Sequence, residues 1–146
     1  MAIHSLVKIY VHVIWGTYYR ERTLINELQK KLYEHLFEKA AEYQIPLLEL
    51  NIQPEHLHML IQLPADKTIA QIIKNFKGES THWINEKNFV PGKFLWQRGY
   101  GAFSVSQSQL EKVKSYIRNQ DKHHERLTFK EEYERWAWKY GVPKNG

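Results

Sequence analysis

Residues 54–62 read PEHLHMLIQ, and the alternation within this stretch decides how the middle of the chain folds. Alternate side chains of a β-strand point to opposite faces of the sheet, so the stretch divides into two sets. One set is His56, His58, Leu60 and Gln62, and the other is Leu57, Met59, Ile61 and Leu63. The apolar set can enter a core while the two imidazoles stand side by side, about 6 to 7 Å apart at the backbone. This spacing suits two ligands of one metal ion.

Three further segments are predicted to contain strands. Residues 6–19 alternate apolar and polar side chains, and residues 47–53 show a second strand pattern. The end of residues 94–106 alternates as well, with Phe103 and Val105 facing inward. A turn that contains proline joins the second strand to the histidine stretch, which predicts a hairpin.

Four segments carry apolar residues at helical spacing. The segments are 23–44, 68–83, 109–124 and 128–140. Each begins at or directly after a residue with N-cap chemistry, and these residues are Thr23, Thr68, Ser108 and Thr128. In the last three segments Gln or Glu follows three positions later, which is the spacing of a capping box.

The predicted order of elements is strand, helix, strand, strand, helix, strand, with helices appended. This is the βαββαβ plan of ferredoxin-like α+β folds, in which helices pack on an antiparallel sheet. An additional C-terminal helix carries Tyr116. The sequence contains no repeat, linker or low-complexity stretch, so residues 1–146 are expected to form a single domain.

Composition limits the class of protein further. Lys and Arg number 21 against 16 Asp and Glu, a formal charge of +5 that favours, without requiring, a polyanionic partner. The chain has no cysteine, which excludes disulfides and thiolate metal sites and indicates a reducing cytoplasm. No apolar run approaches the roughly 20 residues of a membrane span, and the N-terminus lacks the pattern of a secretory signal. We therefore expect a cytoplasmic protein without a membrane partner.

The predicted helix that contains the tyrosine presents two polar groups in one direction. Its apolar stripe is Leu110, Val113 and Ile117, at the spacing of a buried helix face. Tyr116 and Gln120 lie four residues apart on the flank of that stripe, one turn above the other. A helix packed near the histidine strand would therefore bring together a phenol, an amide and two imidazoles.

These four groups suit metal-assisted phosphoryl transfer on DNA. The two imidazoles and the Gln120 carbonyl oxygen would hold a divalent cation, which binds a phosphate oxygen and polarises the phosphorus. Tyr116 would attack that phosphorus, displace a deoxyribose oxygen and form a covalent phosphotyrosine. Because the adduct keeps the energy of one phosphodiester bond, a second strand end can reverse the step without ATP or water.

Simpler interpretations of the same residues stay open from the sequence. His56 and His58 can be surface residues of a half-exposed strand, and Tyr116 can be an aromatic that packs against the sheet. His12 can face the same side as His56 and is interpreted as an ordinary strand residue. Histidines 123–124 are assigned to solvent or to phosphate contacts rather than to a metal.

Three motifs in a fixed order carry a resemblance to a known family. They are HLH at 56–58, GYGAFSVS at 99–106 and YIRNQ at 116–120. The chain resembles the single-tyrosine HUH transposases of the smallest bacterial insertion sequences, the IS200-like transposase family, over nearly its whole length.

The resemblance implies an activity and assigns roles to residues. It implies a transposase that cleaves and rejoins single-stranded DNA at insertion-sequence ends, with Mg2+ or Mn2+ as the metal. It assigns the nucleophile to Tyr116 and the metal ligands to His56, His58 and Gln120. It further implies hairpin-forming DNA ends and a homodimer. Whether the tyrosine helix completes the metal site of its own protomer or that of the partner stays open at this point. The family usually has Asp before its first histidine, where Glu55 stands here.

The basic charge predicts where DNA phosphates bind. The candidate residues lie after the first strand, on the second predicted helix and around the start of the fourth strand. They are Arg20, Arg22, Lys74, Lys77, Lys93, Trp96 and Arg98.

Three alternative functions are compatible with the same sequence. A domesticated relative that processes chromosomal palindromic repeats would share the chemistry. A plasmid-type nicking enzyme would share it too, although such domains usually have a longer chain and a further histidine. A non-catalytic module that binds single-stranded nucleic acid would share the fold class, because such sheets also display aromatic side chains to bases.

Overall fold

The sheet of the computed structural model has its strands in the order β2-β3-β1-β4, and each neighbouring pair is antiparallel. The strands are β1 Tyr10–Gly16, β2 Leu47–Ile52, β3 His56–Gln62 and β4 Gly101–Val105. The structure describes residues 5–120, 131 and 134. Histidines 123–124 and almost all of the predicted helix at 128–140 lie outside these residues. Within them, the predicted ferredoxin-like α+β fold is confirmed.

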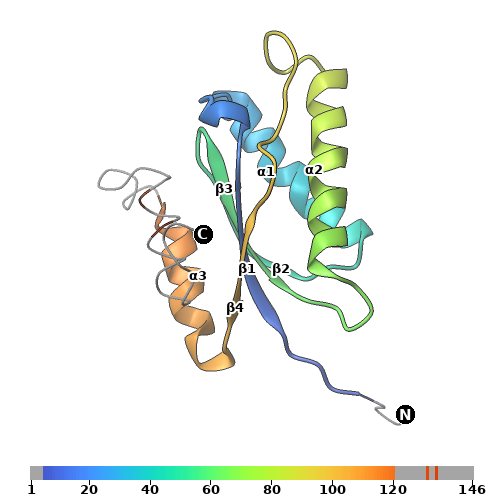
Figure 1. Ribbon diagram of the computed structural model, residues 1–146, viewed down its shortest axis with the longest axis vertical. Coiled ribbons are helices and arrows are strands. Elements are labelled where there is room, and N and C mark those ends of the chain that lie inside the picture. The colour runs from blue at the N-terminus through green and yellow to red at the C-terminus, as the bar shows by residue number, and fades with distance from the viewer. Residues whose placement is uncertain (1–4, 121–130, 132–133, 135–146) are drawn as a thin grey trace.

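Helices cover both faces of this sheet. They are α1 Asn26–Glu42, α2 Ile69–Glu86 and α3 Leu110–Arg118, with short 3-10 turns η1 Tyr18–Arg20 and η2 Gln107–Gln109. Helices α1 and α2 lie on one side of the sheet, and α3 lies on the other side against β2 and β3 (Figure 1). None of the helices in the described part of the chain combines the length and apolar character that a bilayer crossing requires.

The two faces of the sheet hold cores of different size. The larger core lies between the sheet and the α1–α2 layer and includes Val13, Trp15, Leu57, Met59 and Phe76. The smaller core lies under α3 and includes Tyr10, Ile14, Leu60, Val113 and Ile117. Hydrophobic stabilisation grows with buried apolar area, so the α1–α2 face supplies most of it. The α3 face has room for buried polar groups.

The edges of the sheet differ in detail from the sequence pattern. Strand β1 begins at Tyr10, although the alternation suggested a start at residue 6. Strand β4 occupies the end of the segment 94–106, as predicted, and begins two residues after Gly99, which has a φ of 83°. The chain before Gly99 stays close to β1 through a bridge between Thr17 and Trp96.

The helix starts agree with one of the capping predictions and contradict two. Thr68 caps α2, because its Oγ1 accepts a hydrogen bond from the Gln71 N–H at 3.2 Å. The prediction for Thr23 is wrong, since α1 begins only at Asn26. The prediction for Ser108 is also wrong, since this residue lies inside η2, and α3 begins after it.

We expect Thr68→Ala to lower the free energy of unfolding by about 1 kcal/mol, because the Gln71 N–H loses its acceptor. Ser108→Ala is the matched control and should change the free energy of unfolding by less than about 0.5 kcal/mol. Urea unfolding followed by circular dichroism measures both variants. Equal losses in the two would contradict the assignment of the cap.

Candidate active site

The two histidines of β3 face α3, and both side chains are fully buried. Their neighbours Leu57 and Met59 enter the larger core, so the predicted division of the strand into two faces is confirmed. His56 and His58 are therefore not surface residues of a half-exposed strand. Their Nε2 atoms lie 3.2 Å apart, which makes the imidazoles two parts of one site.

The Nδ1 atom of each imidazole makes a polar contact on the side away from the other imidazole. His56 Nδ1 lies 2.9 Å from Glu55 Oε1, and the other carboxylate oxygen of Glu55 accepts from Arg22 Nη1 at 3.1 Å. His58 Nδ1 lies 2.8 Å from Nε2 of His12, a fully buried residue of β1. Metal-binding histidines commonly use one nitrogen for the ion and the other for such a partner. The two Nε2 atoms are thus the pair placed to share a ligand.

The separation of these Nε2 atoms suits one divalent cation. Ligand nitrogens about 2.1 Å from the same ion lie about 3.0 to 3.4 Å apart at octahedral or tetrahedral angles. The observed 3.2 Å falls within this range. In the described part of the chain, no group of three or more His, Cys, Asp or Glu side chains is arranged to hold a metal. Among the described residues, a third protein ligand would therefore be of another chemical type.

Gln120 offers a buried amide oxygen of that other type. Its side chain is fully buried, and its Nε2 donates to the main-chain oxygen of Tyr116 at 3.2 Å. The amide oxygen Oε1 has no hydrogen-bond partner among the residues that the structure describes. A buried acceptor in this state costs about 1 to 3 kcal/mol. A cation bound at Oε1 would offset that cost.

Helix α3 places Tyr116 beside the histidines. The Tyr116 ring packs edge-on against His58, with centroids 6.1 Å apart and planes at 75°. Val113 and Ile117 hold the helix on the smaller core, and Arg118 binds Glu49 of β2 at 3.0 Å. This hydrogen bond to the carboxylate raises the pKa of Arg118. The Tyr116 and His58 rings that meet here belong to the same chain.

One component of the site was missed by the sequence interpretation. His12 was predicted to be an ordinary strand residue, yet its ring stacks on His58 with centroids 5.1 Å apart. In the β1–β3 register Ile14 pairs with His58, and His12 pairs with Leu60, so His12 is the diagonal neighbour of His58. The alternation of β1 gave the correct face. Only the register, which the sequence does not specify, brings the two rings together.

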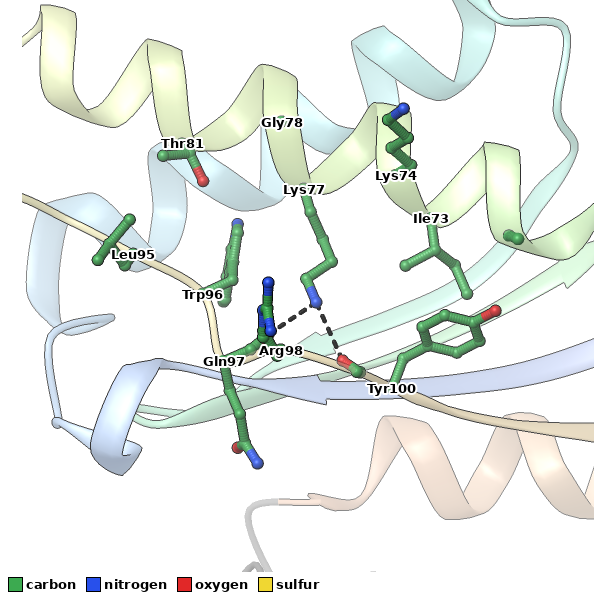
Figure 2. A pocket seen from close by; sticks show the side chains of 12 residues that line it. Ile73, Lys74, Lys77, Gly78, Thr81, Leu95, Trp96, Gln97, Arg98 and Tyr100 are labelled. Atoms are coloured by element: carbon green, nitrogen blue, oxygen red, sulfur yellow. Dashed lines mark hydrogen bonds between the residues drawn. The ribbon is translucent and has the colours of Figure 1, made fainter.

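Four of the predicted DNA-binding residues line one groove, between α2 and the segment 95–100. These residues are Lys74, Lys77, Trp96 and Arg98. The groove has a volume of about 510 Å³. Figure 2 shows Lys77 reaching from α2 across the groove and the Gln97 side chain pointing away from it. Since α2 lies on the face opposite α3, the groove and the histidines are on different sides of the sheet.

The four residues of this groove differ in how they are engaged. Lys77 Nζ donates to the main-chain oxygens of Gln97 and Gly99, at 2.7 and 3.0 Å, and burial lowers its pKa. Trp96 is buried and donates from Nε1 to Ser80 Oγ at 2.9 Å. Lys74 and Arg98 are exposed. Two exposed cations therefore flank a groove whose wall is fixed by Lys77 and Trp96.

The remaining predicted DNA-binding residues lie apart from the groove. Arg20 is exposed and closes η1, and Arg22 is the exposed residue that binds Glu55. Lys93 lines a separate small hollow with Thr17 and Glu21.

Comparison with known proteins gives concordant matches. Residues 5–120 match the family model described as "Transposase IS200 like". The chain is 26% identical over 114 residues to the ISDra2 transposase TnpA of Deinococcus radiodurans, covering 75% of this chain and 81% of that protein. It is also 26% identical over 116 residues to the transposase of insertion sequence element IS200 from Salmonella typhimurium, covering 75% and 74%.

Two solved structures share the fold. The crystal structure of a proposed transposase from Deinococcus radiodurans matches with a TM-score of 0.65 and 25% identity, covering 82% of this chain and 96% of that one. A REP-associated tyrosine transposase bound to a REP hairpin matches with a TM-score of 0.63 and 16% identity, covering 85% and 74%.

The bonds of Lys77 generate a stability prediction. Lys77→Met should lower the free energy of unfolding by about 1 kcal/mol, because two main-chain oxygens lose a charged donor but can still be hydrated. Lys74→Met, on the same helix but exposed, should change it by less than about 0.5 kcal/mol. Urea unfolding compares the two variants. A smaller loss of unfolding free energy in Lys77→Met than in Lys74→Met would show that the hydrogen bonds of Lys77 do not stabilise the fold.

Proposed function

The chain belongs to the IS200-like transposase family, and we propose that it cleaves and rejoins single-stranded DNA through a covalent bond between Tyr116 and a 5′-phosphate. The observation that supports this most directly is the position of the Tyr116 ring against His58, whose Nε2 lies 3.2 Å from that of His56. A nucleophile and a pair of metal-type ligands then share one site.

We propose that His56 Nε2, His58 Nε2 and Gln120 Oε1 hold Mg2+ or Mn2+. A divalent ion bound there supplies charge that stabilises the phosphate oxygens during transfer. The protein's own part is to orient the two imidazoles and to present an amide oxygen from the tyrosine helix. Two observations support this set: the Nε2 separation fits one ion, and the Gln120 Oε1 has no hydrogen-bond partner among residues 5–120.

In the proposed step the Tyr116 oxygen loses its proton and attacks phosphorus in line with the bond to the 3′-oxygen. The bond from the tyrosine oxygen to phosphorus forms, the bond from phosphorus to the 3′-oxygen breaks, and the released 3′-oxygen takes up a proton. A free phenol ionises only near pH 10, so removal of the proton is part of the barrier. A 3′-hydroxyl from another strand end reverses the step and rejoins DNA.

The DNA partner is proposed to be single-stranded with hairpin-forming ends. A REP hairpin is bound by one of the fold neighbours, which motivates this choice. Lys74 and Arg98 at the groove and Arg20 and Lys93 at the end of β1 are the exposed cations proposed to contact phosphates. We propose a homodimer in which each Tyr116 acts at its own protomer's histidines, since these groups meet within one chain.

Formation of a covalent adduct tests the nucleophile. Wild-type protein incubated with Mn2+ and labelled single-stranded DNA bearing the hairpins that flank the gene should give a protein–DNA adduct that survives denaturation. Tyr116→Phe should give none, because the phenolic oxygen is missing. Tyr33→Phe, an exposed tyrosine on α1, is the matched control and should form as much adduct as wild type. An adduct with Tyr116→Phe would disprove the assignment, and none with wild type would favour a binding module.

Separate measurements of binding and cleavage test the histidines. His56→Ala should abolish cleavage, because one of two imidazole ligands is lost, yet leave DNA affinity within about threefold of wild type, because phosphates are gripped elsewhere. Fluorescence anisotropy measures binding and denaturing gels measure cleavage. A parallel loss of both, with an unchanged unfolding midpoint, would mean that His56 contacts DNA rather than metal.

A further inference from the structure

His12 is a buried polar residue that has no direct role in the proposed reaction. Its side chain is fully enclosed between β3 and β4, with the Phe103 ring 6.4 Å away and the His58 ring stacked at 5.1 Å. Its Nε2 lies 2.8 Å from His58 Nδ1, which is a hydrogen bond in either direction. Burying an imidazole where an apolar ring would fit costs free energy, so the hydrogen bond itself calls for an explanation.

The direction of this hydrogen bond decides what His58 can do. A neutral imidazole carries one hydrogen, on Nδ1 or on Nε2, and only the nitrogen without hydrogen can bind a cation. If His58 Nδ1 donates to His12 Nε2, then His58 Nε2 carries a lone pair toward the site. If His12 donates instead, His58 Nε2 carries the hydrogen and is blocked as a ligand.

The direction of the hydrogen bond at His56 Nδ1 is fixed by a different partner, Glu55. Glu55 is a carboxylate and accepts only, so the hydrogen of neutral His56 lies on Nδ1 and its Nε2 is a lone pair. At the corresponding atom His58 faces the imidazole of His12. Whether the two Nε2 atoms converge as ligands therefore depends on His12.

We propose that His12 is the positioning residue of the metal site: its Nε2 accepts the hydrogen of His58 Nδ1 and so directs the His58 lone pair toward the cation. This inference rests on the proposed function for the metal, but not on Tyr116 or on DNA. His12 then carries its own hydrogen on Nδ1. The residue touches neither metal nor substrate and acts entirely through His58.

The competing explanation is that His12 only fills space in the smaller core, and two substitutions separate the explanations. His12→Phe keeps an aromatic ring but removes the acceptor, whereas His12→Gln keeps an acceptor oxygen at similar reach but removes the ring. Space filling predicts that Phe is the better replacement, and positioning predicts that Gln is. His35→Phe is the control, because His35 is also buried and hydrogen-bonded, to Glu79, but lies on α1 at the opposite face.

The readout is the affinity for Mn2+ in the absence of DNA, measured from the electron paramagnetic resonance signal of the free ion. His12→Phe should weaken binding by about 10- to 100-fold, as loss of a partner behind a metal-binding histidine commonly does. His12→Gln and His35→Phe should stay within about threefold of wild type. Wild-type affinity in His12→Phe, or a greater loss in Gln than in Phe, overturns the proposal.

A second measurement decides the matter even if a variant fails to fold. Long-range nitrogen–proton correlation spectra of the wild-type protein with Mg2+ report which ring nitrogen of His58 carries the hydrogen. Positioning by His12 requires it on Nδ1 of His58. A hydrogen on Nε2 overturns the proposal. If wild type binds neither ion, the proposed metal site itself fails, which is distinct from a wrong role for His12.

Discussion

The alternation of β3 between two buried faces is the constraint on which the rest of the structure depends. Leu57 and Met59 pack into the core of the α1–α2 layer, and this packing fixes the register of the strand. A slip by one residue would drive His56 and His58 into that core and turn the apolar side chains toward α3. The hydrophobic face thus sets the position of the polar one, and burial of leucine and methionine on one side is what aligns the imidazoles on the other.

The site on the α3 face is built from groups that hold one another from several elements. Glu55 precedes β3, His12 comes from β1, and the phenol and amide come from α3 and the residues just after it. Each ring is restrained at the nitrogen that faces away from the site, so little reorganisation is needed when a ligand arrives. Arg22 neutralises Glu55 at the protein surface and completes the chain of contacts behind His56.

Much of this arrangement follows from local sequence patterns. The contacts that sequence patterns did not predict mostly join segments that are far apart in the chain. Period two in residues 56–62 and period 3.6 in residues 110–117 are local properties, and they correctly gave the faces on which the imidazoles and the phenol lie. The hydrogen bond of His12 depends on the register between β1 and β3, which packing across the sheet decides. The failed cap at Ser108 has a local cause instead, because a 3-10 turn at residues 107–109 precedes α3 and moves its start beyond the motif. Contacts between distant segments, such as the one between His12 and His58, could not be predicted from the sequence alone.

The two hydrogen bonds between Lys77 and the segment 95–100 have a consequence for how the sequences of such proteins diverge in evolution. Lys77 grips the main-chain oxygens of Gln97 and Gly99, which every amino acid possesses, while the side chains of Arg98 and Tyr100 are exposed around it. Around Arg98 and Tyr100, the path of the segment is therefore held through main-chain oxygens and not through the exposed side chains. Exposed residues such as Arg98 and Tyr100 can therefore be substituted while the backbone keeps its path. The ligand specificity of this groove can then change during evolution without a loss of folding stability.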